Sequence, residues 1–171
     1  MKPFSRMNLT IIMLSAAIIF SVPGCKKSNS DIDGNPNIFN YGTLSATVGG
    51  TNWSAKSVYA VDSSNMVVIF GANDNTGTGF PAIIMTFPSS TPEGATVNFN
   101  IQQYSWLQFI ENSTNVFWAE PSLGGSGSVT ITKFNKGSKK VEGTFAAVAK
   151  PGGQGTTSKT ISGGKFSINY R

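Results

Sequence analysis

The chain has 171 residues, with 13 Lys and Arg, 8 Asp and Glu, one Cys and no His. The lack of histidine excludes a Ser-His-Asp or Cys-His nucleophile and a His-ligated metal, and one cysteine allows neither an internal disulfide nor a thiolate cluster. Charged residues are 12% of the chain, against about 25% in a typical soluble domain. Together with 19 glycines, this composition favours short strands and tight turns over helices. It indicates no reaction and no cofactor.

The first 24 residues have the pattern of a secretory signal peptide. Lys2 and Arg6 give a short positive start, and residues 9–22 carry no charge. A membrane-spanning helix needs about 20 apolar residues, so this run is too short to span. Its length suits the apolar core of a signal peptide, which is about 7–15 residues long. Residues 1–24 are therefore predicted to be removed on export.

The signal segment ends in Val22-Pro23-Gly24-Cys25, which resembles the lipobox of bacterial lipoproteins. The resemblance implies cleavage before Cys25, a diacylglycerol on its sulfur and a further acyl chain on the new amine. The alternative is a buried free thiol, but residues 26–37 are almost all polar and offer little to bury. Residues 25–40 are predicted to be a lipidated, flexible tether. Lys26 stands where an inner-membrane retention signal has Asp, which favours the outer membrane, on either its periplasmic or its surface side.

Residues 41–171 are predicted to form one domain. Their basic charge is concentrated in residues 121–171, where seven lysines and Arg171 face a single acid, Glu142. A basic region can mark nucleic-acid binding. These lysines, however, fall in turns or at strand ends, where solvated charges discourage sheets from pairing edge to edge. No nucleic-acid partner is expected.

Apolar and polar residues alternate along most of the domain, which is typical of half-buried antiparallel strands. The alternating segments are residues 43–48, 53–61, 95–101, 129–132, 141–149 and 166–170. Two short runs, 66–70 and 82–87, are apolar throughout and are predicted to be central strands covered on both faces. Residues 104–110 and 116–119 are predicted to form a hairpin. About ten strands without a helix predict an all-β fold, as a single antiparallel β-sandwich or barrel-like domain.

Two stretches of the domain resemble a known family. The first is Gly42–Ala55, which contains Gly-Thr-Leu-Ser-Ala-Thr-Val followed by Trp53-Ser-Ala, and the second runs from Gly127 to Tyr170 with its Gly-Thr-Phe145 and Gly-Lys-Phe166 strands. Both are similar to small Bacteroidota lipoproteins of uncharacterised function. The resemblance implies an all-β fold and a place in the cell envelope, and it brings no catalytic residues.

One aromatic cluster is a candidate binding site. Tyr104, Trp106 and either Phe117 or Trp118 fall in the predicted hairpin, where they could form a flat platform that stacks on a sugar ring. The alternative is that these large rings fill the core, their usual place. The same hairpin carries Glu111 and Glu120, and paired carboxylates about 5–9.5 Å apart are the machinery of glycosidases.

Metal sites are not predicted. Asp31, Asp33, Asn35 and Asn37 alternate as in a calcium loop, but Pro36 and Gly42 stand where an EF-hand needs Gly and Glu. The sequence Asn73-Asp74-Asn75 is ordinary turn chemistry.

The leading hypothesis is a lipid-anchored envelope protein, not an enzyme, that binds a polysaccharide or an envelope protein or has a structural role. The alternatives are a small glycan-active hydrolase that uses Glu111 and Glu120, and a barrel that holds an apolar ligand inside.

Overall fold

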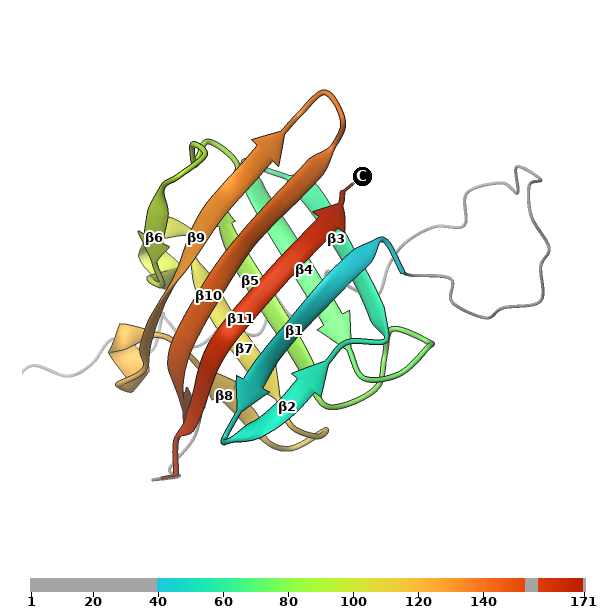
Figure 1. Cartoon of the computed structure of the whole chain (residues 1–171). Helices are drawn as coiled ribbons and strands as arrows, with labels where there is room; N and C mark the ends of the chain where they lie inside the picture. The colour runs from blue at the N-terminus through green and yellow to red at the C-terminus, as the bar shows by residue number, and fades with distance from the viewer. Residues whose placement is uncertain (1–39, 153–156, 171) are drawn as a thin grey trace, which may run out of the picture. The chain divides into compact units, whose positions relative to one another are not determined.

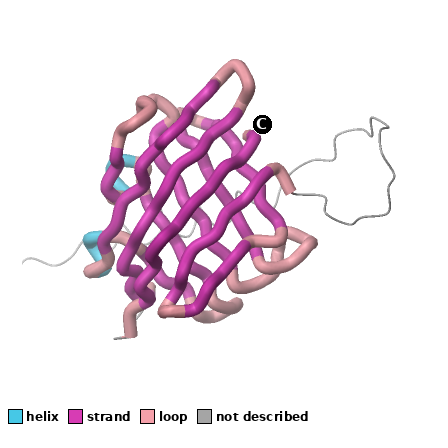
Figure 2. The backbone as a smooth tube through the Cα atoms, viewed as in Figure 1, coloured by secondary structure: helices cyan, strands magenta, loops and turns pink. Residues whose placement is uncertain are grey.

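A computed structural model describes residues 40–152 and 157–170. They form one antiparallel sheet of 11 strands, curled into a half-barrel (Figures 1 and 2). The predicted all-β class, with a single sandwich or barrel-like domain, is confirmed. In the described part of the chain the helical elements are two 3₁₀ turns, η2 (Ile101–Gln103) and η3 (Pro121–Leu123). No helix among the described residues has the length and apolarity needed to cross a membrane.

The curled sheet has two halves, named here after their places in Figure 1. The front half contains β1 (Gly42–Val48), β2 (Thr51–Ser54), β6 (Thr96–Asn98), β9 (Ser126–Asn135), β10 (Lys140–Pro151) and β11 (Lys159–Asn169). The back half contains β3 (Ser57–Ser63), β4 (Met66–Ala72), β5 (Ala82–Pro88), β7 (Trp106–Ile110) and β8 (Val116–Trp118). The strand order is β2-β1-β11-β10-β8-β7-β5-β4-β3, and β9, which pairs β10, also pairs β6.

Strand β10 joins the two halves. Its residues from Lys140 to Val148 pair with β9, and its last two residues, Lys150 and Pro151, pair with Trp118 and Phe117 of β8. One long strand thus belongs to both halves. At the opposite side, the amide of Tyr41 donates to the carbonyl of Val58 in β3 over 2.9 Å. These contacts hold the two halves face to face.

The core lies between the two halves and is made by alternate side chains of each strand. Its largest fully buried members include Leu44, Ile69, Ile83, Met85, Phe87, Phe99, Leu107, Ile131, Ile161 and Ile168. Each such side chain contributes about 1.5–3 kcal/mol relative to its exposed state. The outward positions of the front half, in contrast, are mostly Ser, Thr and Lys, as in the paired row Ser45, Lys165, Thr144, Thr130 and Thr96.

The predicted strand at 53–61 is wrong in one respect. Its alternation placed Tyr59 and Val61 on the same face as Trp53, but the chain leaves β1 at Ala55 and joins β4 at Lys56. The break between β2 and β3 shifts the alternation by one residue. Trp53 is buried in the core, and Val58 rather than Tyr59 is its counterpart in β3.

Two other boundaries and one burial pattern also differ. The strand predicted at 95–101 is confined to β6, because the chain turns into η2 at Ile101, which is exposed. Tyr104 ends η2 in the left-handed conformation and lies outside β7. The run at 82–87 is buried on both faces as predicted, whereas alternate residues of β4 (Met66, Val68, Phe70) are only half-buried. The residues predicted as signal peptide and most of the tether, 1–39, lie outside the described residues.

Candidate functional site

The outward side chains of the back half form a continuous surface that is almost entirely apolar. We call it the apolar face and define it by the outward residues Tyr59, Val61, Met66, Val68, Phe70, Ile84, Thr86, Trp106, Gln108, Ile110, Val116 and Trp118. The outward positions of β3, β4, β5, β7 and β8 carry no Asp, Glu, Lys or Arg. Nine of these residues are half-buried and Val61 is 37% exposed, whereas Ile84 and Thr86 of the central strand β5 are buried, at 8% and 1% exposed.

Two tryptophans contact each other on this face. Trp106 comes from β7 and Trp118 from β8, and their ring centroids are 5.6 Å apart with an angle of 49° between the planes. Both are half-buried and neither belongs to the core cluster. The rings therefore do not form the flat platform that the sequence suggested, but an angled pair whose contact contributes about 0.5–1.5 kcal/mol beyond its buried area.

Gly152 lies close against the edge of the Trp118 ring. A Cβ atom at Gly152 would lie 3.0 Å from Nε1 of Trp118 and 3.2 Å from its Cδ1. The indole thus rests against the backbone just beyond β10. Of the two alternatives at positions 117 and 118, only Trp118 is on the apolar face. Phe117 points inward, and its ring packs 6.1 Å from that of Phe109.

Thr86 attaches the segment before β7 to the apolar face. Its Oγ1 accepts from the Trp106 amide over 3.2 Å and donates to the Tyr104 carbonyl over 3.0 Å. Thr86 is itself 1% exposed, whereas Tyr104 is 64% exposed, the largest value among the exposed large hydrophobic residues. A buried hydroxyl with two hydrogen-bonding partners fixes the conformation of the backbone that it contacts. Tyr104 is thereby fixed next to Trp106 with its ring open to solvent.

The two candidate carboxylates are not brought together. In the β7–β8 hairpin Gln108 lies opposite Trp118 and Ile110 opposite Val116. Glu111 therefore follows one end of the hairpin and Glu120 the other, about five residue steps or roughly 17 Å apart along the strands. This exceeds the separation of about 5–9.5 Å that glycosidases use.

Each of these carboxylates also has a structural partner. Glu120 is 5% exposed and accepts from the amide of Ile101 over 2.8 Å and from that of Ser122 over 3.3 Å. Glu111 forms an ion pair with Lys159. One carboxylate fixes η2 and η3, and the other joins β7 to β11. Nothing in this arrangement supports the hydrolase alternative.

In the turn at Asn73–Asn75, the Asp74 side chain forms hydrogen bonds with residues of the same loop. The Asp74 carboxylate accepts from the Thr76 hydroxyl and, over 3.0 Å, from the Gly77 amide. The Thr76 hydrogen bond and the amides of Gly79, Gly77 and Thr78 lower the pKa of Asp74 below its usual value. Among the described residues, no group of three or more acidic, His or Cys side chains is placed to hold a metal ion. The Asp31–Asn37 segment lies outside them, as does Cys25.

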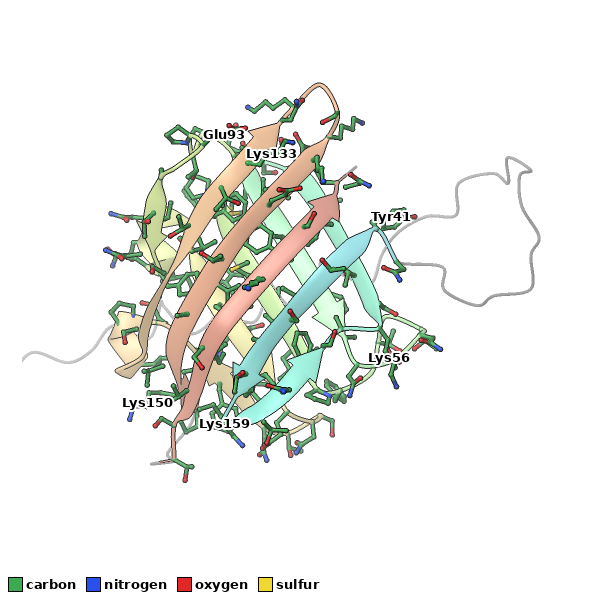
Figure 3. All side chains as sticks on the ribbon, in the orientation of Figure 1. Tyr41, Lys56, Glu93, Lys133, Lys150 and Lys159 are labelled. Carbon is green, nitrogen blue, oxygen red and sulfur yellow. The ribbon has the colours of Figure 1, made fainter. Side chains whose placement is uncertain are left out.

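The interior is filled by the core side chains of both halves. The rings and aliphatic chains from β5, β7, β9 and β11 are buried in one cluster, so the fold offers no support for an apolar ligand held inside. The labelled lysines in Figure 3 are spread over the domain. Lys133 lies near one end, Lys150 and Lys159 at the other, and Lys56 at a side. The prediction that the lysines lie in turns or at strand ends is wrong for Lys165, which lies in the middle of β11, opposite Ser45 and Thr144.

Residues 40–168 match the family described as "Domain of unknown function (DUF6252)". The chain belongs to this family. No curated protein and no solved structure matches it. The prediction that the chain is a member of an uncharacterised family is confirmed, and its lipoprotein character stays a prediction.

The DUF6252 domain has site residues that the sequence did not single out. Thr86 lies in an apolar run and Gly152 in a turn, and neither has a motif of its own. A polar residue inside an otherwise apolar central strand was the available signal for Thr86, because a buried hydroxyl needs a partner. Tyr59 and Phe70 were also missed, since the shift in alternation at Ala55 assigned Tyr59 to the core.

Proposed function

We propose that this protein is a lipid-anchored binding protein of the bacterial cell envelope, and that the apolar face of its DUF6252 domain binds glycans. The Trp106–Trp118 pair carries the proposal, because two large aromatic side chains lie half-open on an outward face instead of in the core. The C–H groups on the face of a sugar ring pack against aromatic rings, while its hydroxyls need hydrogen-bonding partners.

Polar groups lie beside the aromatic pair. Gln108 is directly opposite Trp118 in the hairpin, and it is half-buried. A primary amide both donates and accepts, which suits the hydroxyls of a sugar. The exposed Tyr104 follows η2, where Gln102 and Gln103 are also exposed. The surface therefore combines apolar stacking area with neutral hydrogen-bonding groups.

The proposed role is binding and not catalysis. Glu111 and Glu120 lie at opposite ends of the hairpin, and each is engaged in holding the fold. The proposal needs no metal or cofactor, since stacking and hydrogen bonding to neutral groups suffice for recognition.

The proposed place of action is the cell envelope. The signal segment and Cys25 support covalent attachment to the outer membrane through lipid, with residues 25–40 as the tether. Two or more acyl chains hold a protein stably at a membrane, because each buried methylene contributes about 0.8 kcal/mol. A glycan of the envelope or of the surroundings is then within reach of the domain, and nucleic acid is not.

Tryptophan emission tests glycan binding directly. Two of the three tryptophans lie on the apolar face, and Trp53 is buried, so a ligand on this face changes the emission. We expect Trp106→Ala and Trp118→Ala each to weaken binding by roughly tenfold or more, because each truncation removes a large apolar ring surface that a sugar ring would cover, at about 25 cal/mol per Å².

The matched control is Val148→Ala. Val148 is 37% exposed, as Val61 is, but lies outward on β10 in the front half. This variant should bind like the wild type. If the wild-type emission does not respond to any member of a broad polysaccharide panel, glycan binding is wrong. If an envelope protein binds instead and the tryptophan variants abolish that complex, the face is a protein-docking surface.

A further inference from the structure

A second aromatic pair lies at the far side of the apolar face. The Tyr59 and Phe70 rings are stacked, with centroids 5.0 Å apart and planes at 24°. Tyr59 lies opposite Phe70 in the β3–β4 pair. Both residues are half-buried on the outward side of the sheet. The face therefore has aromatic area at two separate places, one on β3 and β4 and one on β7 and β8.

One cross-strand row connects the two pairs. The strand registers place Tyr59, Phe70, Ile84, Gln108 and Trp118 side by side on β3, β4, β5, β7 and β8. Neighbouring strands are about 4.8 Å apart, so this row spans four strand spacings, or about 19 Å. A single sugar ring covers only part of that length. A chain of several rings that crosses the strands would contact both pairs at once.

The charge of the face restricts the chemistry of its ligand. The outward positions of these five strands carry no Asp, Glu, Lys or Arg, and the row ends beside a cation, Lys150, which lies opposite Trp118 in the β10–β8 pair. The outward side of the front half, in contrast, includes Lys165, Glu142 and Lys133. An acidic polysaccharide laid across the strands would meet Lys150 beside Trp118, but its charged rings over β3, β4 and β5 would lose hydration without gaining a cationic partner. The complementary ligand is neutral.

We infer that the apolar face binds a neutral, extended polysaccharide chain laid across the strands, with the Trp106–Trp118 pair and the Tyr59–Phe70 pair as its two ends. The inference rests on the proposed function and adds to it the length, direction and charge of the glycan. It assigns Tyr59 and Phe70 to the binding of the distal rings.

Ligand length gives the test. Calorimetric titration of the domain in the full-length protein uses disaccharides and hexasaccharides of the cellulose, xylan and mannan series, with oligogalacturonides as the acidic counterpart. A hexasaccharide of one neutral series should bind at least about tenfold more tightly than its disaccharide. Trp118→Ala should weaken the binding of both lengths. Tyr59→Leu should weaken only the hexasaccharide, by about fivefold, because it keeps apolar volume but removes the ring.

The outcomes separate the inference from the proposed function. If no oligosaccharide or polysaccharide binds, both fail. If Trp118→Ala abolishes binding but both lengths bind equally well and Tyr59→Leu has no effect, the extended chain is wrong and glycan binding stands. If the oligogalacturonide binds as tightly as its neutral counterpart, the neutral ligand is wrong.

Control measurements accompany the titrations. Val148→Ala should leave both affinities unchanged, and thermal unfolding should show that Tyr59→Leu is folded. If Tyr59→Leu unfolds, Phe70→Leu removes the same ring pair from the other strand and replaces it in the test. Light scattering tests for self-association. Self-association of the wild type that Trp118→Ala abolishes would show that a second copy covers the face, and this result would overturn the inference.

Discussion

Two glycines of the front half lie beneath phenylalanine rings of the neighbouring strand. Gly143 is opposite Phe166, and Phe145 is opposite Gly164, in the β10–β11 pair. A Cβ atom at Gly164 would lie 2.5 Å from the Phe145 carbonyl oxygen and 2.7 Å from its ring. The Gly-x-Phe spacing seen in both strands therefore has a packing reason: each ring covers the glycine across from it.

This arrangement predicts the cost of adding a methyl group. Gly164→Ala should lower the free energy of unfolding by about 1–3 kcal/mol, because the ring of Phe145 and the backbone must move apart. Gly137→Ala is the control: the nearest atom to its added Cβ would be Asn135 Oδ1 at 3.4 Å, and its effect should stay within about 0.5 kcal/mol. Urea unfolding followed by circular dichroism measures both. Equal stability of the two variants would contradict the packing account.

At the scale of elements, the loop between β4 and β5 depends on one carboxylate. Besides the hydrogen bonds from Thr76 and Gly77, the Ser57 hydroxyl donates to the Asp74 carbonyl. A Cβ atom at Gly79 would lie 2.5 Å from Asp74 Oδ2, so the loop closes tightly around this side chain. The loop connects two strands of the back half, and its order is coupled to the protonation state of Asp74.

The lowered pKa of Asp74 predicts a pH dependence. A carboxylate whose pKa is lower in the folded than in the unfolded state stabilises the fold above the unfolded value of about 4, and this stabilisation is lost as the pH falls through the folded pKa. Wild type should therefore exceed Asp74→Asn in stability near pH 6, and the two should converge near pH 2–3. Thr76→Val, which removes the largest cause of the shift, should reduce the pH dependence. Urea unfolding across this range measures it, and parallel curves for wild type and Asp74→Asn would refute the coupling.

The elements also show how far an alternating pattern can be used. Strands β1, β9, β10 and β11 were predictable because one face of each is polar and exposed. In β7 and β8 the residues on both faces are large and mostly apolar. The pattern therefore predicts burial of Leu107 and of Trp106 equally well. The alternation alone cannot choose between them. The choice depends on which way the sheet curls, and this is decided by distant strands.

At the scale of the whole molecule, the two outward faces differ in character. The front half presents Ser, Thr and Lys to solvent, while the back half presents aromatic and aliphatic residues. Contiguous exposed apolar surface is rare on monomeric domains and marks interaction sites. A domain with one hydrated face and one apolar face has a natural orientation toward a ligand.

The proposed lipid anchor leads to the prediction for the whole chain. When the full-length protein is produced in a bacterium that processes lipoproteins, radiolabelled palmitate should be incorporated, and the mature protein should begin at Cys25. Cys25→Ser should carry no label, because it lacks the only thiol in the chain, and should retain the leader. Trp118→Ala should be labelled like the wild type, since the apolar face takes no part in acylation. An unlabelled wild-type chain that still carries residues 1–24 would refute the anchor, while the glycan titration would remain a separate test of the domain.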